Sequence, residues 1–143
     1  MRGKRLPLAR RNSLQNIKDM DDFYYRKLNV YHLSKQLVID IYSISKKFPA
    51  SEQFGLTNQI QRAAVSIPSN IAEGMGRFSI KERIHHLEFS LGSLMEVMCQ
   101  LEIAESLNYI SANELTIQEG NIKEISKMLT GLRRTFEEKN NNN

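Results

Sequence analysis

Apolar residues between Leu28 and Phe136 recur at helical spacing in four successive segments. Steps of three or four residues place side chains on one face of an α-helix, and no segment alternates with a period of two for long enough to favour a strand. In the first segment the apolar positions are Val30, Leu33, Leu37, Ile41, Ile44 and Phe48. The pattern predicts helices near 28–48, 52–74, 80–107 and 112–137.

Polar residues stand where three of these helices should begin. Ser51 is a candidate N-cap, and Ser79 with Glu82, like Ser111 with Glu114, has the spacing of a capping box. The gaps between the predicted helices are short, which favours antiparallel neighbours. We therefore expect an all-α fold, specifically an antiparallel up-down four-helix bundle.

The stretch RAAVSIPSNIAEGMGR, residues 62–77, contains a proline and a Gly-x-Gly. A phosphate-binding loop is excluded because Gly74 and Gly76 follow a helix, and Arg77 stands where a Walker loop has lysine. Glycine is instead typical of a helix exit, where a left-handed conformation costs it little. Pro68 normally bends or ends a helix, but the apolar spacing continues through it, so we expect one kinked, continuous helix.

Small polar residues form a second stripe on this segment, opposite the apolar one. Small hydroxyl and amide groups suit packing against another helix or subunit. Gly92 costs the third helix stability, which close approach of a neighbouring helix, within or between subunits, would offset. The predicted interface residues are Ser66, Pro68, Ser69, Asn70, Glu73 and Gly92.

The net charge of +4, from 20 basic and 16 acidic residues, is concentrated at the N-terminus. The first eleven residues hold five basic and no acidic side chains, so the rest of the chain is close to neutral. We expect residues 1–22 to be a disordered basic extension, 23–138 the bundle and 139–143 a disordered Asn-rich tail. If Met20 is the true start, most of the extension is not translated.

Candidate chemistry is sparse. Glu82 and His85 form an E-x-x-H of the kind found in di-iron bundles, but a second motif is missing and Glu82 is already explained as a capping residue. The single cysteine, Cys99, is expected to be half-buried and allows no disulfide within the chain, as is common in the cytoplasm. No apolar run approaches the roughly 20 residues that cross a bilayer. We expect a cytoplasmic protein with no enzymatic activity, cofactor, metal or membrane contact.

Nucleic-acid binding would depend on clustered basic side chains. The candidates are Arg2, Lys4, Arg5, Arg10, Arg11, Lys46, Lys47, Arg62 and Arg77.

The run QIQRAAVSIPSNIAEGMGR, with KLNVYHLSKQLVIDIYSISKKFP before it and LEFSLGSLMEVMCQLEIAESLNYI after it, also carries a resemblance. Over residues 24–112 the chain resembles the four-helix-bundle proteins encoded by intervening sequences of bacterial large-subunit ribosomal RNA. The resemblance implies a bundle that assembles into a ring-like homopentamer without enzymatic activity. A related branch, the accessory protein of diversity-generating retroelements, is a basic pentamer that binds nucleic acid and a reverse transcriptase. This chain differs from that branch because its bundle is nearly neutral.

Two functions are therefore expected. The first is a homo-oligomeric accessory protein associated with RNA or DNA, possible partners being a second copy, a nucleic acid and a reverse transcriptase. The alternative is a scaffold that binds another protein and does not contact nucleic acid.

Overall fold

The computed structural model describes residues 22–142, and every regular element within them is a helix. The prediction of an all-α fold with four long helices is confirmed. The elements in chain order are the 3₁₀ helix η1 (Tyr24–Lys27), α2 (Asn29–Ser45), the 3₁₀ helix η2 (Ala50–Glu52), α3 (Leu56–Met75), α4 (Ile80–Ser106) and α5 (Ala112–Asn141). No helix among the described residues is both long and apolar enough to cross a membrane.

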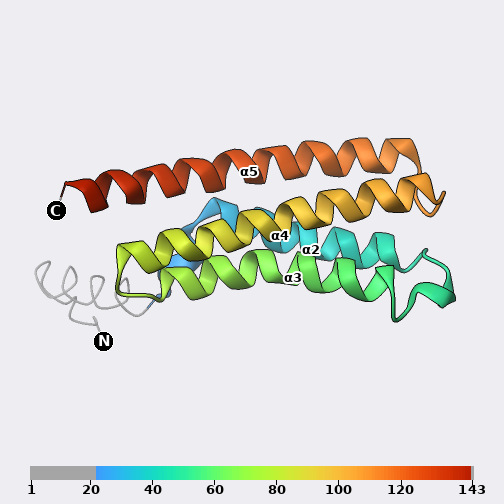
Figure 1. Cartoon of the computed structure of the whole chain (residues 1–143), viewed down its shortest axis with the longest axis horizontal. Coiled ribbons are helices and arrows are strands. Elements are labelled where there is room, and N and C mark those ends of the chain that lie inside the picture. Colours follow the sequence, from blue (N-terminus) through green and yellow to red (C-terminus); the bar gives the residue numbers. More distant parts are fainter. Residues whose placement is uncertain (1–21, 143) are drawn as a thin grey trace, which may run out of the picture.

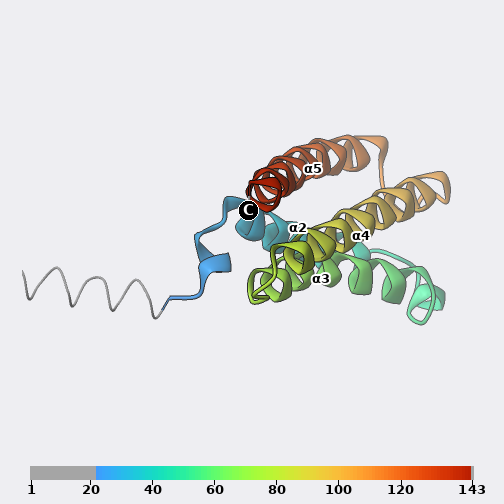
Figure 2. The ribbon, with the colours of Figure 1, turned by 60° about the vertical axis from the view of Figure 1, so that its left-hand side comes forward.

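Consecutive long helices lie side by side, and the chain reverses its direction at each connection (Figure 1). The bundle closes where α2 also contacts α5, so that α2 and α4 occupy opposite corners. Figure 2 shows that the start of α2, the α3–α4 connection and the end of α5 lie at one end of the molecule. The α2–α3 and α4–α5 connections lie at the other end.

The core is made by the apolar stripes that the spacing predicted. Ile41, Ile67 and Leu94 are fully enclosed, and Ile125 and Leu129 of α5 are nearly so. Burying a side chain of this size stabilises the fold by about 1.5–3 kcal/mol. Removal of these apolar stripes from water therefore holds the four helices together.

Two predicted helix boundaries are wrong. α2 ends at Ser45 rather than near residue 48, and Ser51 is not an N-cap because it lies within η2. α3 begins at Leu56. The carboxylate of Glu52, on a longer side chain than that of Ser51, accepts the Leu56 backbone N–H at 3.2 Å. Proline at 49 directs the chain into a 3₁₀ turn first, which delays the helix by about one turn.

The two predicted capping boxes differ. Ser111 and Glu114 cap each other reciprocally, as the spacing indicated. Ser79 accepts the backbone N–H of Glu82 at 3.3 Å, but only this half of the box is made.

The C-terminal boundary is also corrected, because α5 continues to Asn141. Residues 139–141 are therefore helical rather than part of a disordered tail. Buried Phe136 anchors this end, and neither proline nor glycine follows to stop the helix. The predicted disorder of residues 1–21 and of residue 143 lies outside the described residues.

Pro68 lies inside α3, which is continuous from Leu56 to Met75, as predicted. The interpretation of the glycines is wrong in one respect. Gly74 is still inside the helix, and Gly76 caps it in the right-handed region, with φ −84°. A left-handed exit therefore does not explain either glycine.

Glu114 also links the start of α5 to the end of α2 by an ion pair with Lys47. The hydrogen bond from Lys47 is the main reason that the pKa of Glu114 lies below its ordinary value, and the bond from Ser111 adds to the effect. A carboxyl group with a lowered folded pKa stabilises the fold above its unfolded pKa and loses this contribution as the pH falls through its folded pKa.

We expect Glu114→Gln to lower the free energy of unfolding at neutral pH by less than about 1 kcal/mol, since the pair is largely exposed. The difference from the wild type should disappear in acid, below the pKa of Glu114. Urea unfolding at several pH values measures it, with Glu138→Gln as the control on the same helix. An equal difference at neutral and acidic pH would show that the stabilisation does not come from the ionised carboxylate of Glu114.

Candidate interaction surfaces

The predicted small polar stripe of α3 packs against α4 within the same subunit. The Ser66 and Ser93 hydroxyls are 2.7 Å apart, and the Asn70 amide nitrogen donates to the Ser66 hydroxyl at 3.0 Å and to its backbone carbonyl at 2.8 Å. Asn70 Oδ1 lies 3.2 Å from Nδ1 of His86. Ser66 and Asn70 thus have partners inside the subunit, so the stripe suits helix packing, as its composition indicated.

His86 is a packing position that the sequence pattern did not single out. It is buried on α4 and faces α3, where it contacts Asn70. A Cβ added at Gly74 would lie 2.6 Å from Cβ of His86. Gly74 therefore permits the close approach of the two helices. Glycine at the last position but one of a helix rich in small residues was the available signal.

The other predicted interface residues lie on different surfaces. Pro68 and Ser69 line a hollow between α2 and α3. Glu73 is exposed and forms an ion pair with Arg77, with an N–O distance of 2.8 Å. Gly92 is exposed on α4, and a Cβ there would meet no described atom within 4 Å. The predicted close approach at Gly92 is thus not made inside the subunit.

The residues considered for enzymatic chemistry do not form a site. Within residues 22–142, no group of three or more His, Cys, Asp and Glu side chains is placed to hold a metal ion. His85 lies outside the core, with its ring against that of Phe89. Cys99 is exposed rather than half-buried, because its position on α4 points away from the core.

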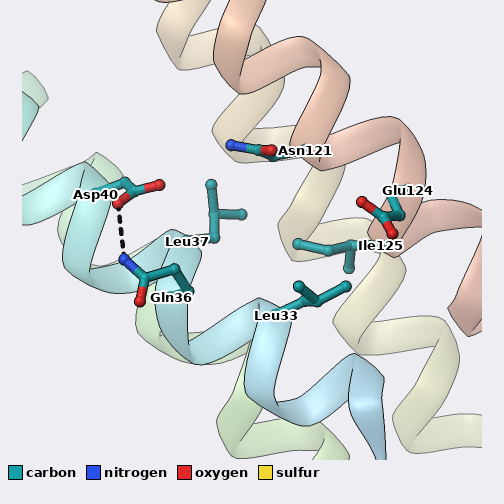
Figure 3. Close-up of a pocket in the computed structure, with 7 residues that line it drawn as sticks. All are labelled: Leu33, Gln36, Leu37, Asp40, Asn121, Glu124 and Ile125. Atoms are coloured by element: carbon teal, nitrogen blue, oxygen red, sulfur yellow. Dashed lines mark hydrogen bonds between the residues drawn. The ribbon is translucent and has the colours of Figure 1, made fainter.

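A pocket between α2 and α5 is too small for a substrate (Figure 3). Its volume is about 60 Å³, whereas pockets for small molecules have about 300–1,000 Å³. Leu37 and Ile125 form its apolar side, and Gln36 donates to Asp40 at its rim at 3.0 Å. Asn121 and Glu124 lie across from them on α5.

The fold separates the basic residues that the sequence proposed for nucleic-acid binding. Arg2, Lys4, Arg5, Arg10 and Arg11 lie outside the described residues. Lys46 and Lys47 follow α2 at one end of the bundle, whereas Arg77 lies in the α3–α4 connection at the other end. Lys47 and Arg77 are both in ion pairs. Arg62 lines a shallow hollow between α3 and α4.

The charges of the bundle are nevertheless strongly separated along its length. Ser66 contacts Ser93, Val38 and Val65 line one hollow, and Met95 and Ser126 line another, so these residues mark one level near the middle of the bundle. On one side of this level lie residues 22–38, 64–94 and 126–142, and on the other lie residues 39–63 and 95–125. The first set, which we name the positive half, has ten basic and six acidic side chains, a net charge of +4. The second set, the negative half, has four basic and eight acidic side chains, a net charge of −4.

Several cations of the positive half are held near the α3–α4 connection and the end of α5. Arg83 donates to the carbonyl of Arg77 at 2.8 Å, and its guanidinium lies 5.6 Å from the ring centroid of Phe136. Lys139 lies over the same ring, also at 5.6 Å. Lys81 and Arg134 are exposed and take part in no ion pair among the described residues.

The architecture and surfaces together define an all-α helical bundle whose described surface carries separated charges and exposed apolar side chains. A family model described as 23S rRNA-intervening sequence protein matches residues 26–131, and the chain belongs to this family. The resemblance seen in the sequence is confirmed.

The chain is also similar to a solved structure from Bacteroides thetaiotaomicron, a protein with unknown function from the S23 ribosomal protein family. The two are 25% identical, the match covers 73% of this chain and 97% of that chain, and the TM-score is 0.68. No curated protein matches the chain. Neither the family model nor the similar structure carries a description that names an enzymatic activity.

Proposed function

We propose that the protein is a non-enzymatic accessory protein of the cytoplasm that forms a ring-like homo-oligomer, a pentamer, and contacts RNA or DNA through its positive half. The observation that carries the proposal is the charge separation of +4 and −4 along a bundle that is neutral in total. A neutral protein binds phosphate only where its charges are unevenly distributed. A ring that places its positive halves on one rim would concentrate positive potential there.

The chain before Asp22 reinforces this location. It carries six basic and two acidic residues and is joined directly to residues 22–38 of the positive half. The 23S rRNA intervening sequence in the family's name is consistent with a nucleic-acid context for this chain.

Binding of a short RNA and a short DNA tests the proposal directly. Fluorescence anisotropy with the full chain should show affinity at low salt that falls steeply towards physiological salt, because each phosphate contact releases counterions. The same titration with a chain that starts at Met20 measures what the leading residues add. No binding of either probe at low salt would contradict the proposal.

A protein scaffold remains the second candidate, and one observation favours it. Large apolar side chains are exposed on α2 and on α4, on opposite corners of the bundle. Exposed apolar surface of this kind is typical of sites for protein partners, among which a reverse transcriptase is one possibility. Retention of a partner protein together with the absence of nucleic-acid binding at low salt would select this candidate.

A further inference from the structure

An apolar surface extends from a hollow between α2 and α3 onto the exposed side of α2. We name it the α2–α3 groove and define it by Tyr31, Val38, Ile39, Tyr42, Val65 and Pro68. Ile39, Tyr42 and Val65 are 40–55% exposed, and Val38 belongs to both hollows that make up the groove. Its charged lining residues are Lys35 and Lys46, and no carboxylate lines it among the described residues.

A second apolar surface lies on the outward side of α4. We name it the α4 face and define it by Phe89, Gly92, Met95, Cys99 and Ile103, which recur every three or four residues. Phe89, Met95 and Ile103 are 45–51% exposed. A helix that carries apolar residues on its outward side as well as on its core side is typical of a helix that is buried in an assembly.

The charged residues beside the α4 face are acidic, whereas those that line the α2–α3 groove are basic. Glu96 and Glu102 are exposed on α4 beside the apolar positions, and neither is in an ion pair among the described residues. Lys123 and Lys127 line the hollow between α4 and α5 on the far side of Met95. The α4 face is thus apolar with acidic neighbours, whereas the α2–α3 groove is apolar with lysines.

The positions of the two surfaces determine the kind of contact that they can make. Because α2 and α4 occupy opposite corners, both surfaces are open on one subunit at the same time. Two different surfaces that bind each other produce a heterologous contact, which generates a closed ring or a filament rather than a two-fold dimer. Gly92, without a side chain, leaves the centre of the α4 face flat for a bulky neighbour.

We propose that the α4 face of one subunit docks into the α2–α3 groove of a second copy. The inference rests on the oligomeric part of the proposed function and names the surfaces that make it. Apolar side chains from both surfaces leave water in the contact, and Glu96 and Glu102 approach the lysines of the groove. Pro68 on one side and Gly92 on the other are thereby both interface residues.

Complementary variants of the full chain test this pairing. The groove variant carries Ile39→Glu and Val65→Glu, and the face variant carries Met95→Glu and Ile103→Glu. All four positions are exposed in the subunit, so circular dichroism should show that both variants keep their helices. Thr116→Glu with Thr130→Glu, exposed on α5, is the matched control.

Native mass spectrometry should give an oligomer for the wild type and the control, and a monomer for each variant alone. An equal mixture of the two variants should form a heterodimer, because it contains one intact groove and one intact face. In this heterodimer the other possible contact would pair the substituted groove with the substituted face. The new carboxylates on both surfaces repel each other, so this contact does not form. If the mixture remains monomeric, or if either variant alone keeps the wild-type mass, the pairing of these two surfaces is wrong. Either result would leave the oligomeric state of the wild type, and that part of the proposed function, unchanged. A wild type that is itself monomeric would overturn both the pairing and the oligomeric part of the proposed function.

Discussion

Replacement of Gly74 by alanine is expected to lower the free energy of unfolding by about 1–3 kcal/mol, the usual cost of overpacking a core. In an ordinary helix this change has the opposite sign, since alanine stabilises a helix interior by about 0.5–1 kcal/mol relative to glycine. Here the new Cβ would lie 2.6 Å from Cβ of His86, so α3 and α4 must move apart. That movement also strains the contacts of Asn70 with His86 and of Ser66 with Ser93.

Gly120→Ala and Gly131→Ala are the matched controls, because a Cβ at either position meets no described atom within 4 Å. Both should leave stability unchanged or raise it. Urea unfolding followed by circular dichroism compares the three variants. A Gly74→Ala variant as stable as the controls would contradict the claim that the close approach of α3 and α4 requires glycine at position 74.

Reversal of charge in the positive half should weaken nucleic-acid binding strongly. We expect Lys81→Glu with Arg134→Glu to lower affinity for a short RNA by about tenfold or more at physiological salt, and the salt slope to fall by about 1 for each lost phosphate contact. Both side chains are exposed and free of ion pairs among the described residues, so stability should change little.

Arg62→Glu with Lys123→Glu makes the same change of net charge in the negative half and serves as the control. It should weaken binding much less, provided that its oligomer mass matches that of the wild type. Equal loss in both variants would show that binding follows total charge rather than the positive half. The result also tests Arg62, which the sequence proposed as a contact.

Much of the fold could be predicted from the sequence because it depends on local signals. The spacing of Val30, Leu37 and Ile41 defines a core stripe, and Ser111 with Glu114 defines a helix start. The start of α3 could not be predicted as well, because Ser51 and Glu52 compete locally and the 3₁₀ turn after Pro49 decides between them.

The candidate site could be predicted less well, since it depends on residues far apart in the chain. Small polar residues on α3 indicated a packing face, but their partners His86 and Ser93 are on another helix. Arg77 and Lys47 both look like free cations in the sequence, whereas the fold pairs each with a carboxylate. The separation into net charges of +4 and −4 arises only because the chain folds back, so that the ends of α3 and α5 lie at the same end of the bundle as the start of α2.

Ultraviolet cross-linking of the full chain to RNA, followed by mass spectrometry of the peptides, tests the central claim most directly. Both halves contain exposed aromatic side chains that can cross-link, such as Tyr24 and Phe78 in the positive half and Tyr42 and Phe54 in the negative half. We predict that the cross-linked peptides come from residues 22–38, 64–94 and 126–142 or from the chain before them. Cross-links concentrated in residues 39–63 and 95–125 would contradict the proposed interface.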